Sequence, residues 1–242
     1  MEIKAVDIRK SFGSNEVLKG LTLTIKSGSI CTILGGSGSG KSVFLKHLTG
    51  LVRPDSGSIF VDGNDITRFK EEELFPLRRR IAMIFQSGGL LGSMTVGENV
   101  GLGLVEHRMA SPEEIARVVR QKLALVHLEG KENEIPANLS GGMKKRVSIA
   151  RALTLNPELI LYDEPTAGLD PPMAETIDDL ILELTRDLKV TSVVVTHDLK
   201  SVFKLGGTLN MLHDGRIVES AEAGEFRNSD NAIVREFLRR GV

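Results

Sequence analysis

Eight consecutive residues between an apolar run and a helical pattern have the spacing of a phosphate-binding loop. They are Gly35, Gly36, Ser37, Gly38, Ser39, Gly40, Lys41 and Ser42. The glycines let the backbone curl so that its N–H groups surround phosphate oxygens, and the following helix adds its positive N-terminus. Lys41 adds a mobile positive charge, and the Ser42 hydroxyl suits a Mg²⁺ ion that bridges the phosphates. A flexible Gly/Ser linker would match by chance with a probability of roughly 0.01, so we predict a nucleotide site.

Two adjacent carboxylates, Asp163 and Glu164, follow the apolar run 159–162. Ligands of parallel α/β sheets bind at the carboxyl ends of the strands, so this position fits the same nucleotide. We expect Asp163 to assist Mg²⁺, directly or through water, and Glu164 to polarise the attacking water. The alternative is a solvated acidic turn, which the phosphate-binding loop in the same chain disfavours.

Two further polar residues follow apolar runs. His197 comes after the run 193–195 and is a candidate sensor of the γ-phosphate, although a lone histidine is more often structural. Gln86 follows the run 81–85 and is a candidate to reach Mg²⁺ or the attacking water. The other histidines have no such placement, and we interpret them as surface or packing residues: His47, His107, His127 and His213.

The segments that must position these residues include strands of two kinds. Residues 21–25 alternate apolar and polar side chains, and with 3–8 and 59–61 they are predicted to form an antiparallel layer. Other runs are continuously apolar, which suits parallel strands covered on both faces: 30–34, 159–162 and 193–195. The run 209–218 carries Asp-Gly between apolar stretches and predicts a hairpin, followed by a short helix.

Helical patterns alternate with these strands, at 42–49 and 172–188, so the fold class is α/β. Strand patterns disappear between Gln86 and Pro157. There Ser111 is predicted to cap a helix, with proline at its first position and Glu114 completing a capping box. We therefore expect a single domain of 1–242. Its α/β core is 1–86 with 157–242, and about 87–156 form an inserted α-helical subdomain.

Composition indicates a globular chain. The 242 residues are 41% apolar, enough for one large α/β domain or two small ones, and the formal charge of −1 gives no general attraction to nucleic acid. The longest apolar runs are far shorter than the ~20 residues of a spanning helix, and residues 1–10 lack an apolar signal core. We expect a cytosolic location. The single cysteine, Cys31, is predicted to be a buried strand thiol.

A second small anion site is predicted at 139–143, Leu-Ser-Gly-Gly-Met, at the start of a helix. One chain does not need two phosphate cradles. At this point the sequence resembles the ATP-binding cassette (ABC) family across nearly its whole length, with each motif in the family's order. The resemblance implies a P-loop NTPase fold with a RecA-like core, an antiparallel β layer and an inserted helical subdomain. It also implies ATP and Mg²⁺ as cofactors.

The resemblance assigns roles to named residues. Phe12 matches the aromatic that stacks on adenine, and Val17 and Val43 match positions beside the nucleotide. It makes residues 35–42 the Walker A loop, Gln86 the Q-loop, Asp163 and Glu164 the Walker B pair, and His197 the switch histidine. The remaining residues would act on the partner's nucleotide: Ser140, Gly141, Gly142 and Met143 of the signature motif, and Asp170 of the D-loop.

The family's mechanism implies a dimer of cassettes that sandwiches two ATP molecules and moves an integral-membrane permease. The permease would dock near Gln86 and hold the chain at the cytoplasmic face of the inner membrane. Met143 in place of the usual glutamine, Tyr162 and the segments 85–91 and 95–100 resemble the ATPases of Mce-type phospholipid transporters. An Mce-type lipid-binding protein is then an expected partner. ATPases of amino-acid import or lipoprotein release share the same motifs and remain alternatives.

Other function classes are weighed by architecture. A soluble ABC ATPase acting on DNA or ribosomes would carry coiled coils, zinc modules or a second cassette, whereas a cluster-assembly ATPase remains possible. A small-molecule kinase is opposed by residues 139–143 and by Glu164. Basic triplets at 78–80 and 144–146 lack interleaved aromatics, so we interpret them as solvated helix faces and expect no nucleic-acid partner.

Overall fold

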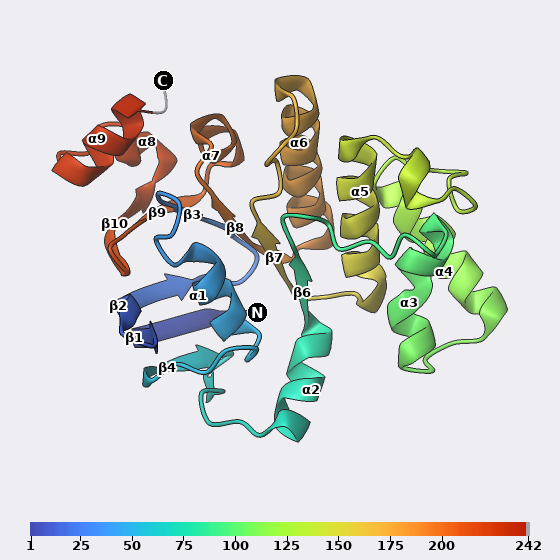
Figure 1. Ribbon diagram of the computed structural model, residues 1–242, viewed down its shortest axis with the longest axis horizontal. Helices are drawn as coiled ribbons and strands as arrows, with labels where there is room; N and C mark the ends of the chain where they lie inside the picture. The colour runs from blue at the N-terminus through green and yellow to red at the C-terminus, as the bar shows by residue number, and fades with distance from the viewer. Residues whose placement is uncertain (241–242) are drawn as a thin grey trace.

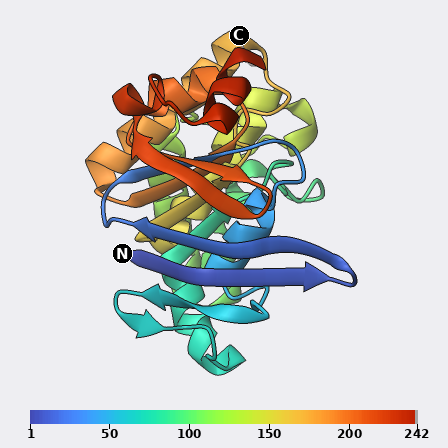
Figure 2. The same cartoon turned by 90° about the vertical axis from the view of Figure 1, so that its left-hand side faces the viewer.

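The computed structural model describes residues 1–240, so residues 241 and 242 of the predicted 1–242 domain lie outside the described residues. One of its two sheets is antiparallel, and the predicted pairing of 3–8 with 21–25 and 59–61 is confirmed. Figures 1 and 2 show this sheet along one side of the molecule. Its strands, in spatial order, are β2 (Asn15–Ile25), β1 (Ile3–Phe12), β4 (Ser56–Val61) and β5 (Asn64–Asp65).

The second sheet is mixed and carries the candidate site. The predicted parallel strands are confirmed, because β3 pairs with β8 and β9, and β7 pairs with β8 and β6. The predicted hairpin is also confirmed, since β9 and β10 pair in antiparallel fashion. In spatial order the strands are β10 (Arg216–Glu222), β9 (Thr208–His213), β3 (Ile30–Leu34), β8 (Thr191–Thr196), β7 (Leu159–Asp163) and β6 (Ile81–Ile84).

Helices cover the mixed sheet. The predicted α1 (Lys41–Leu48), α6 (Pro171–Leu188) and α9 (Ala232–Arg240) are present. Sequence patterns did not predict α2 (Glu71–Arg80), which is mostly charged, holds Pro76 and buries only two leucines. Its first turn is acidic and its last turn basic, which matches the helix dipole. Two more short helices, α7 (Leu199–Leu205) and α8 (Ala223–Phe226), were also not predicted.

Residues 87–156 contain helices and no described strand. Figure 1 shows α3 (Val96–Glu106), α4 (Pro112–Leu125) and α5 (Gly141–Ala152) on the side opposite the antiparallel sheet. Ser111 caps α4 and Pro112 begins it, as predicted. The capping box is wrong, because the Glu114 carboxylate pairs with Arg117 on its own helix instead.

Two main apolar clusters hold these layers together. One fills the space between the two sheets around α1, and the other lies between the mixed sheet and the helices α3, α5 and α6. A smaller cluster packs beneath α7, α8 and α9. Cys31 is buried as predicted, and burial raises the pKa of its thiol to about 12, so it stays protonated.

Candidate functional site

The loop 35–40 joins β3 to α1 and fits tightly against its neighbours. A Cβ atom at Gly35 would lie 2.4 Å from the Leu212 carbonyl oxygen. Gly40 has a φ of +104°, and a Cβ there would lie 2.8 Å from Leu18 Cδ2, so glycine is required. Around Gly36 and Gly38 the corresponding space is open within 4 Å. The loop is therefore packed against the protein at Gly35 and Gly40 and open at Gly36 and Gly38.

Several donors of this loop are available to an anion. No side chain among the described residues caps the N-terminus of α1, whose N-cap residue is Gly40. Ser39 Oγ is buried without a partner among the described residues, while Ser37 is exposed at the outer side of the loop. These groups fit the oxygens of a polyphosphate.

Lys41 begins α1 and is only 7% exposed. Its ammonium donates to the carbonyl oxygens of Gly35 at 2.8 Å and Gly36 at 3.1 Å. It also lies 3.5 Å from Glu164 Oε1. The positive charge of Lys41 is thus held inside the loop and faces the carboxylate of Glu164, which follows β7.

Asp163 is the last residue of β7, one residue beyond the predicted run, and it accepts a hydrogen bond of 2.8 Å from Ser42 Oγ. Burial raises the pKa of its carboxyl, and the Ser42 bond opposes that shift. Hydroxyl and carboxylate oxygens are the donors that Mg²⁺ prefers. The described residues contain no group of three or more metal-binding side chains, so these two oxygens fit an ion whose other ligands are phosphate and water.

Glu164 has a φ of +49°, an uncommon conformation for a residue with a side chain. Its N–H donates to the Val195 carbonyl oxygen at 2.9 Å, which ties it to β8. Its Oε2 lies 2.9 Å from His197 Nδ1, at the end of the same strand. Lys41, Glu164 and His197 therefore lie together, and the placement of Glu164 and His197 at one sheet edge agrees with their predicted strand-end positions.

Gln86 lies just beyond β6, at the same sheet edge, and its side chain is exposed. Its carbonyl oxygen, however, accepts a hydrogen bond from the ammonium of Lys145. Lys145 is 7% exposed, so a solvated face is wrong for this member of 144–146. The sequence carried a signal for this contact, since Lys145, Ser148 and Arg151 recur every three residues along α5.

The triplet 78–80 is also more than a solvated face. Arg78 donates to the carbonyl oxygens of Thr49 and Gly50, and Arg80 pairs with Glu158 and Asp62. These arginines hold α2 against its neighbours.

Ser140 and Asp170 occupy matching positions at the starts of two adjacent helices. Ser140 caps α5 by accepting from the Met143 N–H at 3.3 Å, and Asp170 caps α6 by accepting from the Met173 N–H at 2.9 Å. A Cβ atom at Gly142 would lie 2.8 Å from Met173 Sδ, so glycine lets the two helices pack closely here. Gly141 is exposed beside Ser140.

The three residues expected beside the nucleotide lie on three different elements. Phe12 is 50% exposed at the end of β1, with the Lys10 ammonium 5.5 Å from its ring centre. Val17 borders the loop, because its Cγ1 would lie 3.3 Å from a Cβ at Gly40. Val43 packs partly against the core between the sheets.

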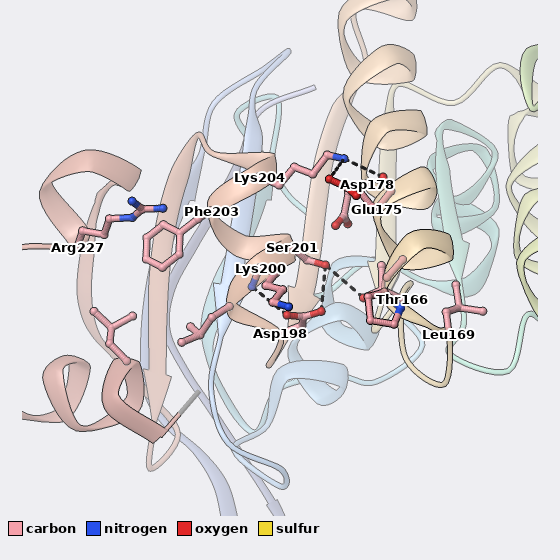
Figure 3. Close-up of a pocket in the computed structure, with 14 residues that line it drawn as sticks. Thr166, Leu169, Glu175, Asp178, Asp198, Lys200, Ser201, Phe203, Lys204 and Arg227 are labelled. Atoms are coloured by element: carbon pink, nitrogen blue, oxygen red, sulfur yellow. Dashed lines mark hydrogen bonds and ion pairs between the residues drawn. The ribbon is translucent and has the colours of Figure 1, made fainter. Parts of the chain in front are cut away.

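A hydrogen-bonded cluster that sequence reasoning missed connects the segment before Asp170 to the helix after His197. Thr166 Oγ1 lies 3.4 Å from Ser201 Oγ, which donates to Asp198 at 3.4 Å (Figure 3). Thr166, Ser201 and Asp198 line a groove, and Asp178, which is 3% exposed, lines it too. Burial raises the pKa of its carboxyl to about 6, and a bond from Ser201 opposes the shift.

We predict that Asp178→Asn stabilises the chain at about pH 7.5. The buried carboxyl binds a proton between its unfolded pKa of 3.8 and its folded pKa of about 6, so stability falls as pH rises through this window. The ionised form costs on the order of 1–3 kcal/mol above that window. Thermal melts should show a higher Tm at pH 7.5 and a shrinking gain toward pH 4. The exposed neighbour supplies the control, Asp179→Asn, and equal shifts in both variants would refute the prediction.

The phosphate loop, the strand-end carboxylates and the capped start of α5 together define the class of ATP-binding cassettes. Residues 18–167 match the family described as ABC transporter. The chain therefore belongs to the ABC transporter family, and its class is that of the ATP-hydrolysing cassettes.

Relatives at 40% identity or above cover almost all of this chain. The "Probable ribonucleotide transport ATP-binding protein mkl" of Mycobacterium tuberculosis is 40% identical over 98% of it. "Methionine import ATP-binding protein MetN" of Rhizobium johnstonii is 43% identical over 98%. The Arabidopsis thaliana protein "TRIGALACTOSYLDIACYLGLYCEROL 3, chloroplastic" is 40% identical over 97%. The chain spans 66%, 65% and 72% of their respective lengths.

Solved cassettes have the same fold. The "ATP-binding cassette MJ0796 bound to ADP and Pi", a dimeric structure of a post-hydrolysis state, matches with a TM-score of 0.82 at 34% identity, over 91% of this chain and 98% of that one. The cbiO1 protein of Clostridium perfringens, described as part of the ABC transporter complex cbiONQ, matches at 0.85 and 29% identity, over 99% and 98%. The predicted P-loop NTPase fold of the ABC type is confirmed.

Proposed function

We propose that the chain is the ATPase of a membrane transporter, with about 87–156 as its helical subdomain between core segments 1–86 and 157–242. The observation that carries this proposal is the convergence of Lys41, Glu164 and His197 at one sheet edge. In this proposal the loop 35–42 holds the phosphates and Glu164 orients the attacking water. Ser42, Asp163 and Gln86 hold Mg²⁺, which neutralises charge on the phosphates when bound.

We propose further that two copies sandwich two ATP molecules. Ser140, Gly141, Gly142, Met143 and Asp170 would then contact the nucleotide held by the loop of the partner. Support comes from the separate placement of the two parts of the site within one chain. The helix α5, which begins at the signature motif, packs against α6, whereas α1, which follows the phosphate loop, packs against β7. In Figure 1, α6 lies between α1 and α5. The post-hydrolysis structure of the MJ0796 cassette is also dimeric.

Ser140→Arg tests the sandwich. We expect the variant to bind ATP like the wild type, because the loop 35–42 is untouched, yet to lose ATP hydrolysis, because the larger side chain obstructs the site offered to the partner. Calorimetry measures the binding, and phosphate release measures the turnover. Ser140→Ala is the size control. A loss of ATP affinity in the isolated arginine chain would mean that the signature segment acts within its own chain.

A membrane permease is the proposed partner at the groove between α2, β6 and α3. Exposed apolar side chains lie on or beside these elements: Phe75 on α2 is 52% exposed, Val105 on α3 is 56% exposed, and Met109 in the loop after α3 is 44% exposed. Phe75 also contacts the His107 ring edge-on. No helix among the described residues is long and apolar enough to cross a bilayer. The proposed location is the cytoplasmic face of the inner membrane, bound through this permease.

The proposed cargo is phospholipid in an Mce-type system with its lipid-binding protein. Support comes from Met143, Tyr162 and the segment 86–100, and from a relative named after a galactolipid. In the fold Tyr162 is fully buried and Met143 packs against the second core cluster. Amino-acid import is the second candidate, because the methionine import protein is 43% identical.

Purification from membranes in mild detergent, followed by lipid analysis, tests the cargo. We expect bound phospholipid and a co-purifying permease with a lipid-binding protein. Deleting the gene should raise detergent sensitivity, and Glu164→Gln should fail to restore the wild type. A co-purifying periplasmic solute receptor without phospholipid would overturn the lipid proposal and leave the ATPase assignment intact.

A further inference from the structure

Lys145 lies at the meeting point of three segments that carry candidate site residues. It stands five residues after the Ser140 cap on α5. Its ammonium donates to the carbonyl oxygen of Gln86 and lies 3.5 Å from the carbonyl oxygen of Glu164. One buried side chain therefore joins the signature helix to the backbones of the Q-loop and of Glu164.

The next turns of α5 hold the same loop. Ser148 Oγ donates to the Gly88 carbonyl oxygen at 2.8 Å, and Arg151 donates to the carbonyl oxygens of Gly88 at 2.9 Å and Gly89 at 2.7 Å. A Cβ atom at Gly88 would lie 2.7 Å from Ser148 Oγ, so the loop backbone lies directly against the helix. Residues 86–89 and α5 thus form one unit.

A buried charge at position 145 carries a cost. Burial lowers the pKa of Lys145, which reports the cost of removing its charge from water, and the charges of Asp163 and Glu164 only partly oppose that shift. An apolar side chain of similar length would avoid this cost, since replacing a buried ion by well-packed apolar atoms is often neutral or stabilising. An apolar side chain, however, has no donor for hydrogen bonds to the carbonyl oxygens of Gln86 and Glu164.

We propose that Lys145 is a positioning residue that couples the two ATP sites of the dimer. The inference rests on the proposed sandwich, in which the start of α5 contacts the nucleotide of the partner. Five residues of helix span about 7.5 Å and transmit a shift of that end rigidly. Lys145 passes the shift to Gln86 and to the backbone of Glu164, so ATP at one site sets the catalytic geometry of the other.

The test compares the full chain with its Lys145→Met variant. We expect kcat to fall by about 10²-fold, because small displacements of a catalytic group cost that much. The Kd for ATP should not change, since Lys145 bonds to Gln86 and Glu164 and not to the loop 35–42. The Tm should change little, because the gain from removing a buried charge opposes the cost of two unpaired carbonyl groups. The Hill coefficient for ATP should fall from above one to one. A protein in which Lys145 only stabilises the fold would lose Tm instead.

Controls isolate the charge and the position. Lys144→Met makes the same change one residue earlier, at a side chain without a hydrogen bond among the described residues, and should behave like the wild type. Lys145→Arg keeps the charge and should retain most of the turnover and the cooperativity. If the methionine variant does not fold, Lys145→Ala, which also has no donor, replaces it, with the same expected loss of cooperativity.

The outcomes separate this inference from the proposed function. A wild-type chain without ATP hydrolysis would contradict the proposed function. Hydrolysis that is lost in Glu164→Gln but unchanged in Lys145→Met would overturn only the role of Lys145. A wild-type Hill coefficient of one, or an unchanged coefficient in the methionine variant, would overturn the coupling.

Discussion

Glu164→Gln is expected to bind ATP like the wild type and to lose hydrolysis by about 10²–10⁴-fold, the usual cost of removing a positioned base. Glutamine keeps the size of the side chain but cannot accept a proton from water. In the proposed site the nucleotide is held by the loop 35–42 and not by this carboxylate. Oε2 of Glu164 is 2.9 Å from His197 Nδ1, so the substitution also removes the charge that faces the histidine.

The measurement for this variant is phosphate release at saturating ATP, together with size-exclusion chromatography. Without hydrolysis, ATP should trap a closed dimer that the wild type forms only transiently. Glu129→Gln makes the same change at an exposed residue outside the candidate site. It should leave phosphate release and the elution of the chain unchanged. Near-normal turnover in Glu164→Gln would remove Glu164 from the catalytic role.

Lys41→Ala is expected to act on binding itself. The ammonium is 7% exposed and lies inside the loop, so a phosphate there would meet a largely desolvated charge. Losing charge-assisted hydrogen bonds of about 1.5–3 kcal/mol weakens ATP binding by roughly 10- to 150-fold. Its bonds to Gly35 and Gly36 disappear as well, which loosens the cradle.

Calorimetry with ATP checks this prediction. Lys26→Ala removes an exposed lysine outside the site and should leave the Kd unchanged. The two site variants should differ in kind, since Glu164→Gln keeps affinity and Lys41→Ala loses it. An unchanged Kd in Lys41→Ala would show that the loop does not hold phosphate as argued.

The strands and the strand-end residues could be predicted because one local signal fixes them. Continuous apolar runs at 30–34 and 159–162 specify buried parallel strands, and the residue after such a run must lie at the carboxyl edge of the sheet. That rule placed Glu164 and His197 together without any knowledge of their contact. It did not reveal the positive φ of Glu164 or the bond from its N–H to the Val195 carbonyl oxygen, because both arise from the tertiary fold.

The errors arose where tertiary contacts override local pattern. The charged helix α2 has too few apolar positions to show a helical stripe, and Arg78 holds it through carbonyl groups that no periodicity reveals. The prediction that Lys145 is solvated followed from the usual exposure of charged side chains. In the fold its ammonium instead bonds to backbone oxygens of two segments that are distant in sequence. Asp178 likewise sits in an apolar helix stripe as a buried acid.

Mixing Lys41→Ala chains with Ser140→Arg chains tests the shared ATP site most directly. At an ATP concentration well below the Kd of Lys41→Ala, each preparation alone should be nearly inactive, because every site of its symmetric dimer lacks either the lysine or an open signature segment. A mixed dimer contains one site built from the intact loop of one chain and the intact Ser140 of the other. ATP hydrolysis is therefore expected to return in part on mixing, since the other site of the mixed dimer remains defective. If tagged pull-downs show that mixed dimers form and hydrolysis does not return, the sandwiched site is contradicted.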